Sequence, residues 1–166
     1  ALLPLHNGAR GCDPDVFDRW QNGANGLNIL ETDHWCLLLP PEWWAANEDD
    51  VVRIVDNDEV GELEVSTLCK DSGAVSQQEI AAMAEEESPE IRQWKAAQLG
   101  VFAGVMGEFS ENDEAWIREW YVAAGPVLLY ITYICDLENK GMDDPSVEEL
   151  LNTLVLGDNP SAGQEI

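Results

Sequence analysis

The segment 116–135, WIREWYVAAGPVLLYITYIC, contains two β-strand patterns in succession, joined by the turn sequence Ala-Gly-Pro. In the first pattern, Trp116, Arg118 and Trp120 alternate with Ile117 and Glu119. The second pattern, 127–134, is apolar on both faces apart from one threonine. A strand of this kind lies in the interior of a sheet whose two faces are both covered. The segment therefore predicts a central strand in a layered structure.

The chain has 166 residues, a length that suits one domain with a substantial core. We expect an irregular N-terminal lead-in over 1–33, a single α+β domain over 34–157 and a polar tail over 158–166. The longest unbroken apolar run, 127–131, is much shorter than the roughly 20 residues of a spanning helix. We therefore predict no transmembrane segment. We expect a cytoplasmic location, or a periplasmic one if a leader preceded Ala1 and was removed.

Periodicity and turn residues predict the order of the elements. Strand patterns cover 34–39, 51–55, 61–70 and 99–109, followed by the two strands of 116–135. Ser76 and Glu79 form a capping-box pattern that begins one helix. Asp144 and Pro145 begin a second helix, with an apolar stripe that extends to Val155. The expected fold class is α+β: an antiparallel sheet of about six strands with helices on both faces, an α/β/α sandwich.

The formal net charge of −25 restricts the partners of the chain. An acidic surface repels the phosphates of nucleic acids and the headgroups of anionic membranes, so we predict binding to neither. Three interpretations of the acidity stay open. The acids can form an ordinary solvated surface, they can reflect adaptation to a salty environment, or they can attract a basic partner protein.

Several segments resemble a known fold superfamily. The sequence LLLPPEW at 37–43 is similar to the "strand, LPxxW" opening of the PsbP/Mog-like fold, and GELEVS at 61–66 resembles its second landmark. The double strand at 116–135 and the leucine-rich final helix resemble its end, so the likeness covers about 34–157. The superfamily includes a photosystem extrinsic subunit, a Ran-GTPase-binding protein, DcrB-like envelope proteins and secretion adaptors. The resemblance implies a DcrB-like or adaptor-like bacterial α/β/α sandwich that binds proteins; no catalytic residue transfers from it.

Two short patterns in the sequence could contribute to a metal site, and each also has a structural interpretation. His34 and Cys36 lie two residues apart and could supply two zinc ligands, but a buried histidine and a core thiol are the favoured interpretation. Asp56 and Asp58 resemble the start of a calcium loop that lacks its later ligands, so a hairpin turn is favoured. We predict no metal, no cofactor and no catalytic residue.

Four residues are candidates for contact with a partner: Trp43, Trp44, Glu62 and Glu64. Two adjacent tryptophans in an extended chain point in opposite directions, so one of the pair should be partly exposed, and exposed tryptophans often anchor interfaces. Glu62 and Glu64 share one strand face, as a catalytic carboxylate pair would, but a solvated face is the favoured interpretation.

We therefore predict a non-enzymatic bacterial protein that binds another protein, as an adaptor, chaperone or immunity protein does, with a basic partner as one of the open interpretations of its acidity. The alternative is a metal-dependent or carboxylate-based hydrolase. The oligomeric state is left open.

Overall fold

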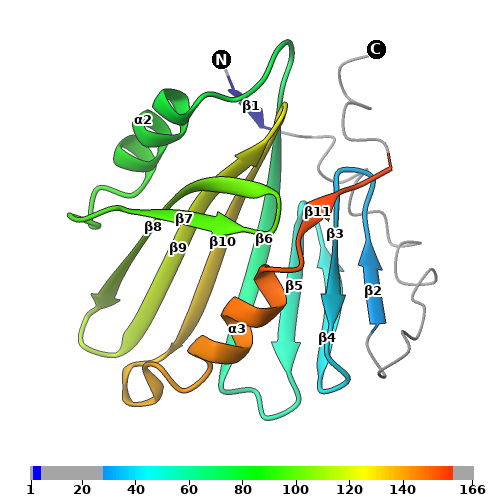
Figure 1. Ribbon diagram of the computed structural model, residues 1–166. Coiled ribbons are helices and arrows are strands. Elements are labelled where there is room, and N and C mark those ends of the chain that lie inside the picture. The colour runs from blue at the N-terminus through cyan, green and yellow to red at the C-terminus, as the bar shows by residue number, and fades with distance from the viewer. Residues whose placement is uncertain (1, 5–27, 159–166) are drawn as a thin grey trace.

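The computed structural model describes residues 2–4 and 28–158, which form two antiparallel β-sheets and two α-helices (Figure 1). The strands are β1 (Leu2–Pro4), β2 (Asn28–Glu31), β3 (Trp35–Leu39), β4 (Trp43–Glu48), β5 (Val51–Asp56), β6 (Gly61–Lys70), β7 (Lys95–Leu99), β8 (Phe102–Glu111), β9 (Ala115–Ala124), β10 (Val127–Asp136) and β11 (Val155–Leu156). The helices are α2 (Gln77–Glu87), α3 (Asp144–Leu151) and the short 3-10 helix η2 (Leu137–Asn139). Most of the predicted lead-in and tail lies outside the described residues.

The large sheet has the order β4-β5-β6-β10-β9-β8-β7, and β1 pairs with the end of β6. The hairpin of β9 and β10 turns at Gly125, whose φ of 57° is the left-handed conformation that glycine adopts without strain. β10 lies between β6 and β9, and most of its side chains are buried. The prediction of a central strand from its apolar sequence is confirmed.

The predicted α/β/α sandwich is wrong. Only two α-helices occur in the described residues, and a second sheet, ordered β11-β3-β2, takes the place of a helical layer. Part of the error lies near the C-terminus, where the helix prediction continued to Val155. α3 ends at Leu151, and Val155 instead pairs with Cys36 of β3. An apolar residue at helical spacing fits a strand equally well when the strand is very short, so the pattern did not distinguish the two.

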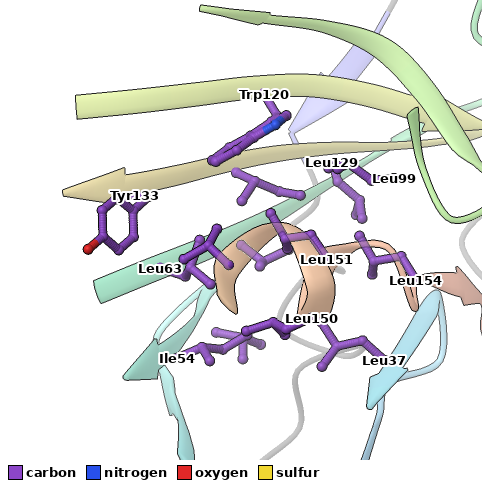
Figure 2. Packing of buried hydrophobic residues seen from close by; sticks show 14 of the residues in the cluster. Leu37, Ile54, Leu63, Leu99, Trp120, Leu129, Tyr133, Leu150, Leu151 and Leu154 are labelled. Carbon is purple, nitrogen blue, oxygen red and sulfur yellow. The ribbon is translucent and has the colours of Figure 1, made fainter. Parts of the chain in front are cut away.

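The core lies between the small sheet and one face of the large sheet, which we call the covered face. Leu37 of β3, Leu150 and Leu151 of α3 and Leu129 of β10 are all at most 1% exposed. Figure 2 shows the α3 leucines placed between β3 and the strands of the large sheet. Burial of apolar side chains from both sheets and the helix is the main source of stability for such a layered structure.

α2 packs on the opposite face of the large sheet, over β8 and β9 (Figure 1). Its predicted capping box is present: Ser76 Oγ accepts from the Glu79 N–H at 3.1 Å, and the Glu79 carboxylate accepts from the Ser76 N–H at 3.0 Å. Ile80 and Ala84 are the buried residues of the helix. Neither this helix nor any other in the described ranges combines the length and the apolar character needed to cross a bilayer.

The sequence patterns missed β1, β2, β4 and β11 and merged β7 with β8. β4 begins one residue after a Pro-Pro pair, and its composition, WWAANE, lacks a clear alternation. The predicted strand 99–109 is the end of β7 and most of β8, divided by a turn at Gly100 and Val101. Gly100 has φ 60°, and a Cβ there would lie 1.9 Å from the Leu154 carbonyl oxygen. This close approach explains why glycine stands at the turn.

Candidate functional site

The face of the large sheet that carries α2 is uncovered over β4, β5, β6 and the end of β10 among the described residues. Its outward side chains are Trp44, Arg53, Glu62, Glu64 and Ile134, and we call this surface the open face. Glu62 lies opposite Val55 on β5 and Ile134 on β10, and Arg53 lies opposite Glu64. The alternation of strands places all five side chains on the same side of the sheet.

The two adjacent tryptophans differ as the sequence predicted. Trp43 is 2% exposed and packs in the core, whereas Trp44 is 38% exposed on the open face. The indole nitrogen of Trp43 is buried without a hydrogen-bond partner among the described residues, which is a cost that its packing must offset. The prediction that one of the pair would be partly exposed is confirmed, and it identifies Trp44. Its contact with a partner stays a prediction.

Arg53 lies at the centre of the open face. Its guanidinium group lies 5.9 Å from the ring centroid of Trp44, pairs with Glu62 and reaches Glu48 at 3.5 Å. A cation placed over an indole ring stabilises that arrangement. The Trp44 ring therefore lies beside a guanidinium group that is itself paired with acids.

Glu64 lies next to this group and forms no ion pair with the described residues. Partial burial raises its pKa above the ordinary value, and the nearby carboxylates of Glu62 and Glu48 raise it further. Three carboxylates thus surround a single guanidinium. The open face combines an exposed aromatic ring with an excess of negative charge, an arrangement that suits a positively charged group of a partner.

Among the described residues, His34 and Cys36 meet no further ligands that would complete a zinc site. His34 is 1% exposed and precedes β3, and Cys36 is a half-buried residue of β3 whose pKa is raised by burial. The three cysteines in the described ranges, Cys36, Cys69 and Cys135, are all free thiols. In these ranges, one group of three side chains could together bind a metal ion, and it includes neither His34 nor Cys36.

That group consists of Asp56, Asp58 and Asp143, whose ligand oxygens all lie within 4.8 Å of one another. Asp143 is 7% exposed and accepts a hydrogen bond of 2.8 Å from the hydroxyl of Tyr133. Burial raises the pKa of Asp143, and repulsion from Asp58 and Asp56 raises it further. The sequence could not reveal Asp143 as a neighbour because it lies in a distant loop.

The turn between β5 and β6 agrees with the hairpin interpretation. The Asp56 carboxylate accepts from the Asp58 N–H at 3.1 Å, and the Asp58 carboxylate accepts from the Val60 N–H at 3.0 Å. Short aspartate side chains stabilise turns in this way. These carboxylates therefore have a structural role that requires no cation.

Arg118 organises a second polar region, on the covered face near β7. Its side chain is 4% exposed and donates to Glu108 at 3.2 Å, to Asp144 at 3.1 Å and to Glu148 at 3.1 Å. The guanidinium group also lies 4.8 Å from the ring centroid of Trp120. The sequence placed Arg118 on a strand face with two tryptophans, but its acidic partners come from β8 and α3. No local pattern could have indicated them.

Beneath the end of α2, a buried polar group separates the helix-covered region from the open face. Ser88 donates to the Glu119 carboxylate, and the Ser88 Oγ lies 2.8 Å from the Tyr121 hydroxyl. Burial raises the pKa of Tyr121 to about 12. The tyrosine therefore stays neutral at physiological pH, and the group acts as a hydrogen-bonded anchor for the helix end.

Comparison with known proteins gives structural neighbours only. No family model matches the chain, and no curated protein matches it by sequence. A crystal structure from Bacteroides thetaiotaomicron matches at TM-score 0.54 and 14% identity, over 74% of this chain and 44% of that one. LpqN, involved in cell envelope biogenesis of Mycobacterium tuberculosis, matches at TM-score 0.52 and 14% identity, over 86% of this chain and 94% of LpqN.

A third structure, the cyanobacterial PsbP of Synechocystis, matches at TM-score 0.36 and 13% identity, over 81% of this chain and 94% of that protein. A PsbP protein is therefore among the neighbours, in keeping with the resemblance in the sequence, but this superposition is too loose to support an inference. The likeness to LpqN extends over almost its whole length and concerns the fold alone. The chain spans less than half the length of the Bacteroides structure. Nothing in these matches identifies a DcrB-like or adaptor-like member.

Proposed function

We propose that the chain is a non-enzymatic protein that binds another protein through the open face. The observation that carries this proposal is Trp44, which is 38% exposed on a sheet surface that the described residues leave uncovered. A large aromatic side chain in solvent gains free energy when a partner covers it, and such residues dominate the energies of many interfaces. Ile134, at 39% exposure, is a second exposed apolar side chain on the same face, in the same cross-strand row as Trp44 and separated from it by Val55 and Glu62.

The chemistry of the partner follows from the charges around Trp44. Glu48, Glu62 and Glu64 outnumber Arg53, and the whole chain carries a net charge of −25. Such a field accelerates encounter with a basic protein and disfavours an acidic one. We therefore propose a partner with lysine or arginine side chains around an apolar recess that accepts Trp44.

The cell envelope is the proposed setting. The support is the fold shared with LpqN, a protein involved in cell envelope biogenesis, which favours the periplasmic alternative over a cytoplasmic location. A fusion of the gene to a reporter that is active only after export tests this setting directly. A fusion protein that accumulates in the cell while its reporter stays inactive would contradict it.

The binding proposal is tested by site-specific photo-cross-linking in the organism that carries the gene. A photoreactive phenylalanine analogue replaces Trp44 in one strain and Met142, an exposed apolar residue outside the open face, in a control strain. We expect one protein to be cross-linked from position 44 and not from position 142. Mass spectrometry of the adduct identifies it.

A second pair of strains tests the role of charge. Glu64→Lys should reduce the yield of the adduct formed from position 44, whereas Glu138→Lys, a change in a surface segment away from the open face, should not. If position 44 yields no adduct beyond those formed from position 142, the open face is not a binding surface.

A further inference from the structure

β7 is the last strand of the large sheet, at the edge opposite β4. The two-residue hairpin between β7 and β8 closes with the hydrogen-bonded pair Leu99 and Phe102. Because hydrogen-bonded and non-hydrogen-bonded pairs alternate along an antiparallel ladder, Ala97 and Gly104 form the next hydrogen-bonded pair. Ala96 and Gln98 therefore point their backbone N–H and C=O groups away from β8. No described strand pairs with this outer edge, and both residues are exposed.

A groove of about 440 Å³ follows β7 on the covered face. Ala97, Met106 and Trp120 line it from the large sheet, and Asp144 and Glu148 of α3 line it from above. Ala97 has a small side chain on the covered face of the edge strand, so a long side chain from outside the sheet can cross over it. The groove is thus open along the same edge whose backbone groups are unpaired.

The exposed charge of the groove is negative. Arg118 is 4% exposed at the base, whereas the side chains of Glu108, Asp144 and Glu148 are 29%, 35% and 56% exposed. Each of the three carboxylates has one oxygen within hydrogen-bond distance of Arg118. Their other oxygens accept no hydrogen bond from the described residues, and Lys95 adds the one further positive charge of the lining.

We propose that β7 accepts an extended segment of a partner protein as an additional strand, and that lysine or arginine side chains of this segment enter the groove. Main-chain hydrogen bonds to Ala96 and Gln98 would provide affinity, and alternate basic side chains would provide specificity. The aliphatic part of each basic side chain can pack on Ala97 and Met106 while its charged end reaches Glu108 or Glu148.

A second copy of this chain is a poor occupant. Two chains that each carry a net charge of −25 repel one another, and edge-to-edge pairing would bring two acidic grooves together. The site also differs from the open face, because it lies at the other edge of the large sheet and on its other face. It therefore neither requires nor replaces the proposed role of Trp44.

The test uses the full chain and a synthetic peptide of alternating lysine and valine, with a matched peptide of alternating glutamate and valine. Binding is followed by NMR on labelled protein at low salt. We expect the lysine peptide to shift the amide signals of residues 95–99 and to slow the exchange of the Ala96 and Gln98 amide hydrogens. The glutamate peptide should produce neither effect. Raising the salt from about 0.05 M to about 0.5 M should weaken the lysine peptide's affinity.

Two variants locate the site. Ala96→Pro removes an outward N–H that the fold itself does not use, and it should weaken binding of the lysine peptide about tenfold. Glu148→Gln removes the most exposed carboxylate and should weaken binding about threefold. Trp44→Ala should leave the affinity for this peptide unchanged. Circular dichroism confirms that each variant is folded.

Three outcomes would overturn the proposal. One is equal binding of the lysine peptide by Ala96→Pro and the unchanged protein, which would indicate diffuse attraction by the acidic surface. Another is equal binding of the glutamate peptide. The third is slow exchange of the Ala96 and Gln98 amides in the free protein, which would show that the chain itself or a second copy already covers the edge. None of these results bears on cross-linking from position 44.

Discussion

The two faces of the large sheet share their strands but differ in what covers them. The covered face packs against the small sheet and α3, and its side chains, such as Ile131, are fully buried. The other face is covered by α2 at one end only, and Ile134, three residues further along β10, is 39% exposed. The same strand thus supplies both a core position and a surface position. The covered face holds the fold together, and the open face leaves an aromatic and acidic surface exposed.

The largest expected effect comes from a matched pair of substitutions in β10. Ile131→Ala removes a fully buried side chain and should lower the free energy of unfolding by about 2–5 kcal/mol. Ile134→Ala changes a half-exposed position and should cost less than about 1 kcal/mol. Urea denaturation followed by circular dichroism measures both. Equal losses would show that the open face is covered in solution.

The two arginines extend the comparison to charged groups. Arg118→Met leaves three carboxylates around an uncharged side chain in a buried location and should cost about 3 kcal/mol. Arg53→Met removes a half-exposed ion pair and should cost about 1 kcal/mol or less. Thermal and urea unfolding of the two variants test the difference. A more stable Arg118→Met variant would mean that desolvation of the guanidinium outweighs its three contacts.

Stability should depend on pH through Asp143. Its folded pKa is raised, so at mildly acidic pH the folded chain retains this proton while the unfolded chain has lost it. The free energy of unfolding should therefore fall as the pH rises from the ordinary aspartate range through the folded pKa. Asp143→Asn keeps an acceptor for Tyr133 and should remove this part of the pH dependence.

Urea titrations at several pH values provide the measurement, with the exposed Asp136→Asn as control. An unchanged pH profile in Asp143→Asn would show that the Asp143 carboxylate does not carry the effect.

The smallest effect concerns Trp44 itself. Trp44→Phe should change stability by less than about 1 kcal/mol, since the side chain is partly in solvent and loses mainly its contact with Arg53. The part of the emission that Trp44→Phe removes is the fluorescence of Trp44. In the unchanged protein, caesium ions should quench this component more strongly than iodide ions, because the nearby acids attract cations. If iodide quenches the Trp44 component as strongly as caesium, the acids do not shape the field at this ring.

Local signals in the sequence were sufficient for some elements. The alternation over Gly61–Lys70 gave β6 with its bounds, and Ser76 with Glu79 gave the start of α2, because neighbouring residues determine both features. The apolar 127–134 segment gave the central strand. The exposure of one member of the Trp43–Trp44 pair followed from simple alternation, although the sequence did not indicate which one and β4 itself was not recognised.

Features that depend on distant pairing could not be predicted. The small sheet joins β3 to the very short β11, and two residues carry too little pattern to indicate a strand. Asp143 meets Asp56 and Asp58 only in the folded chain, and the three acids of Arg118 come from two different elements. The fold class was therefore wrong, while its most apolar strand was placed correctly.

The pairing of β11 with β3 also has a consequence during synthesis. β11 and α3 are the last described elements to leave the ribosome, yet they complete the small sheet and supply Leu150, Leu151 and Leu154 to the core. A nascent chain that ends before residue 144 lacks these side chains and exposes apolar surface on the covered face. We expect such truncated chains to require chaperone protection, and the final cooperative folding step to follow the emergence of α3 and β11 from the ribosome.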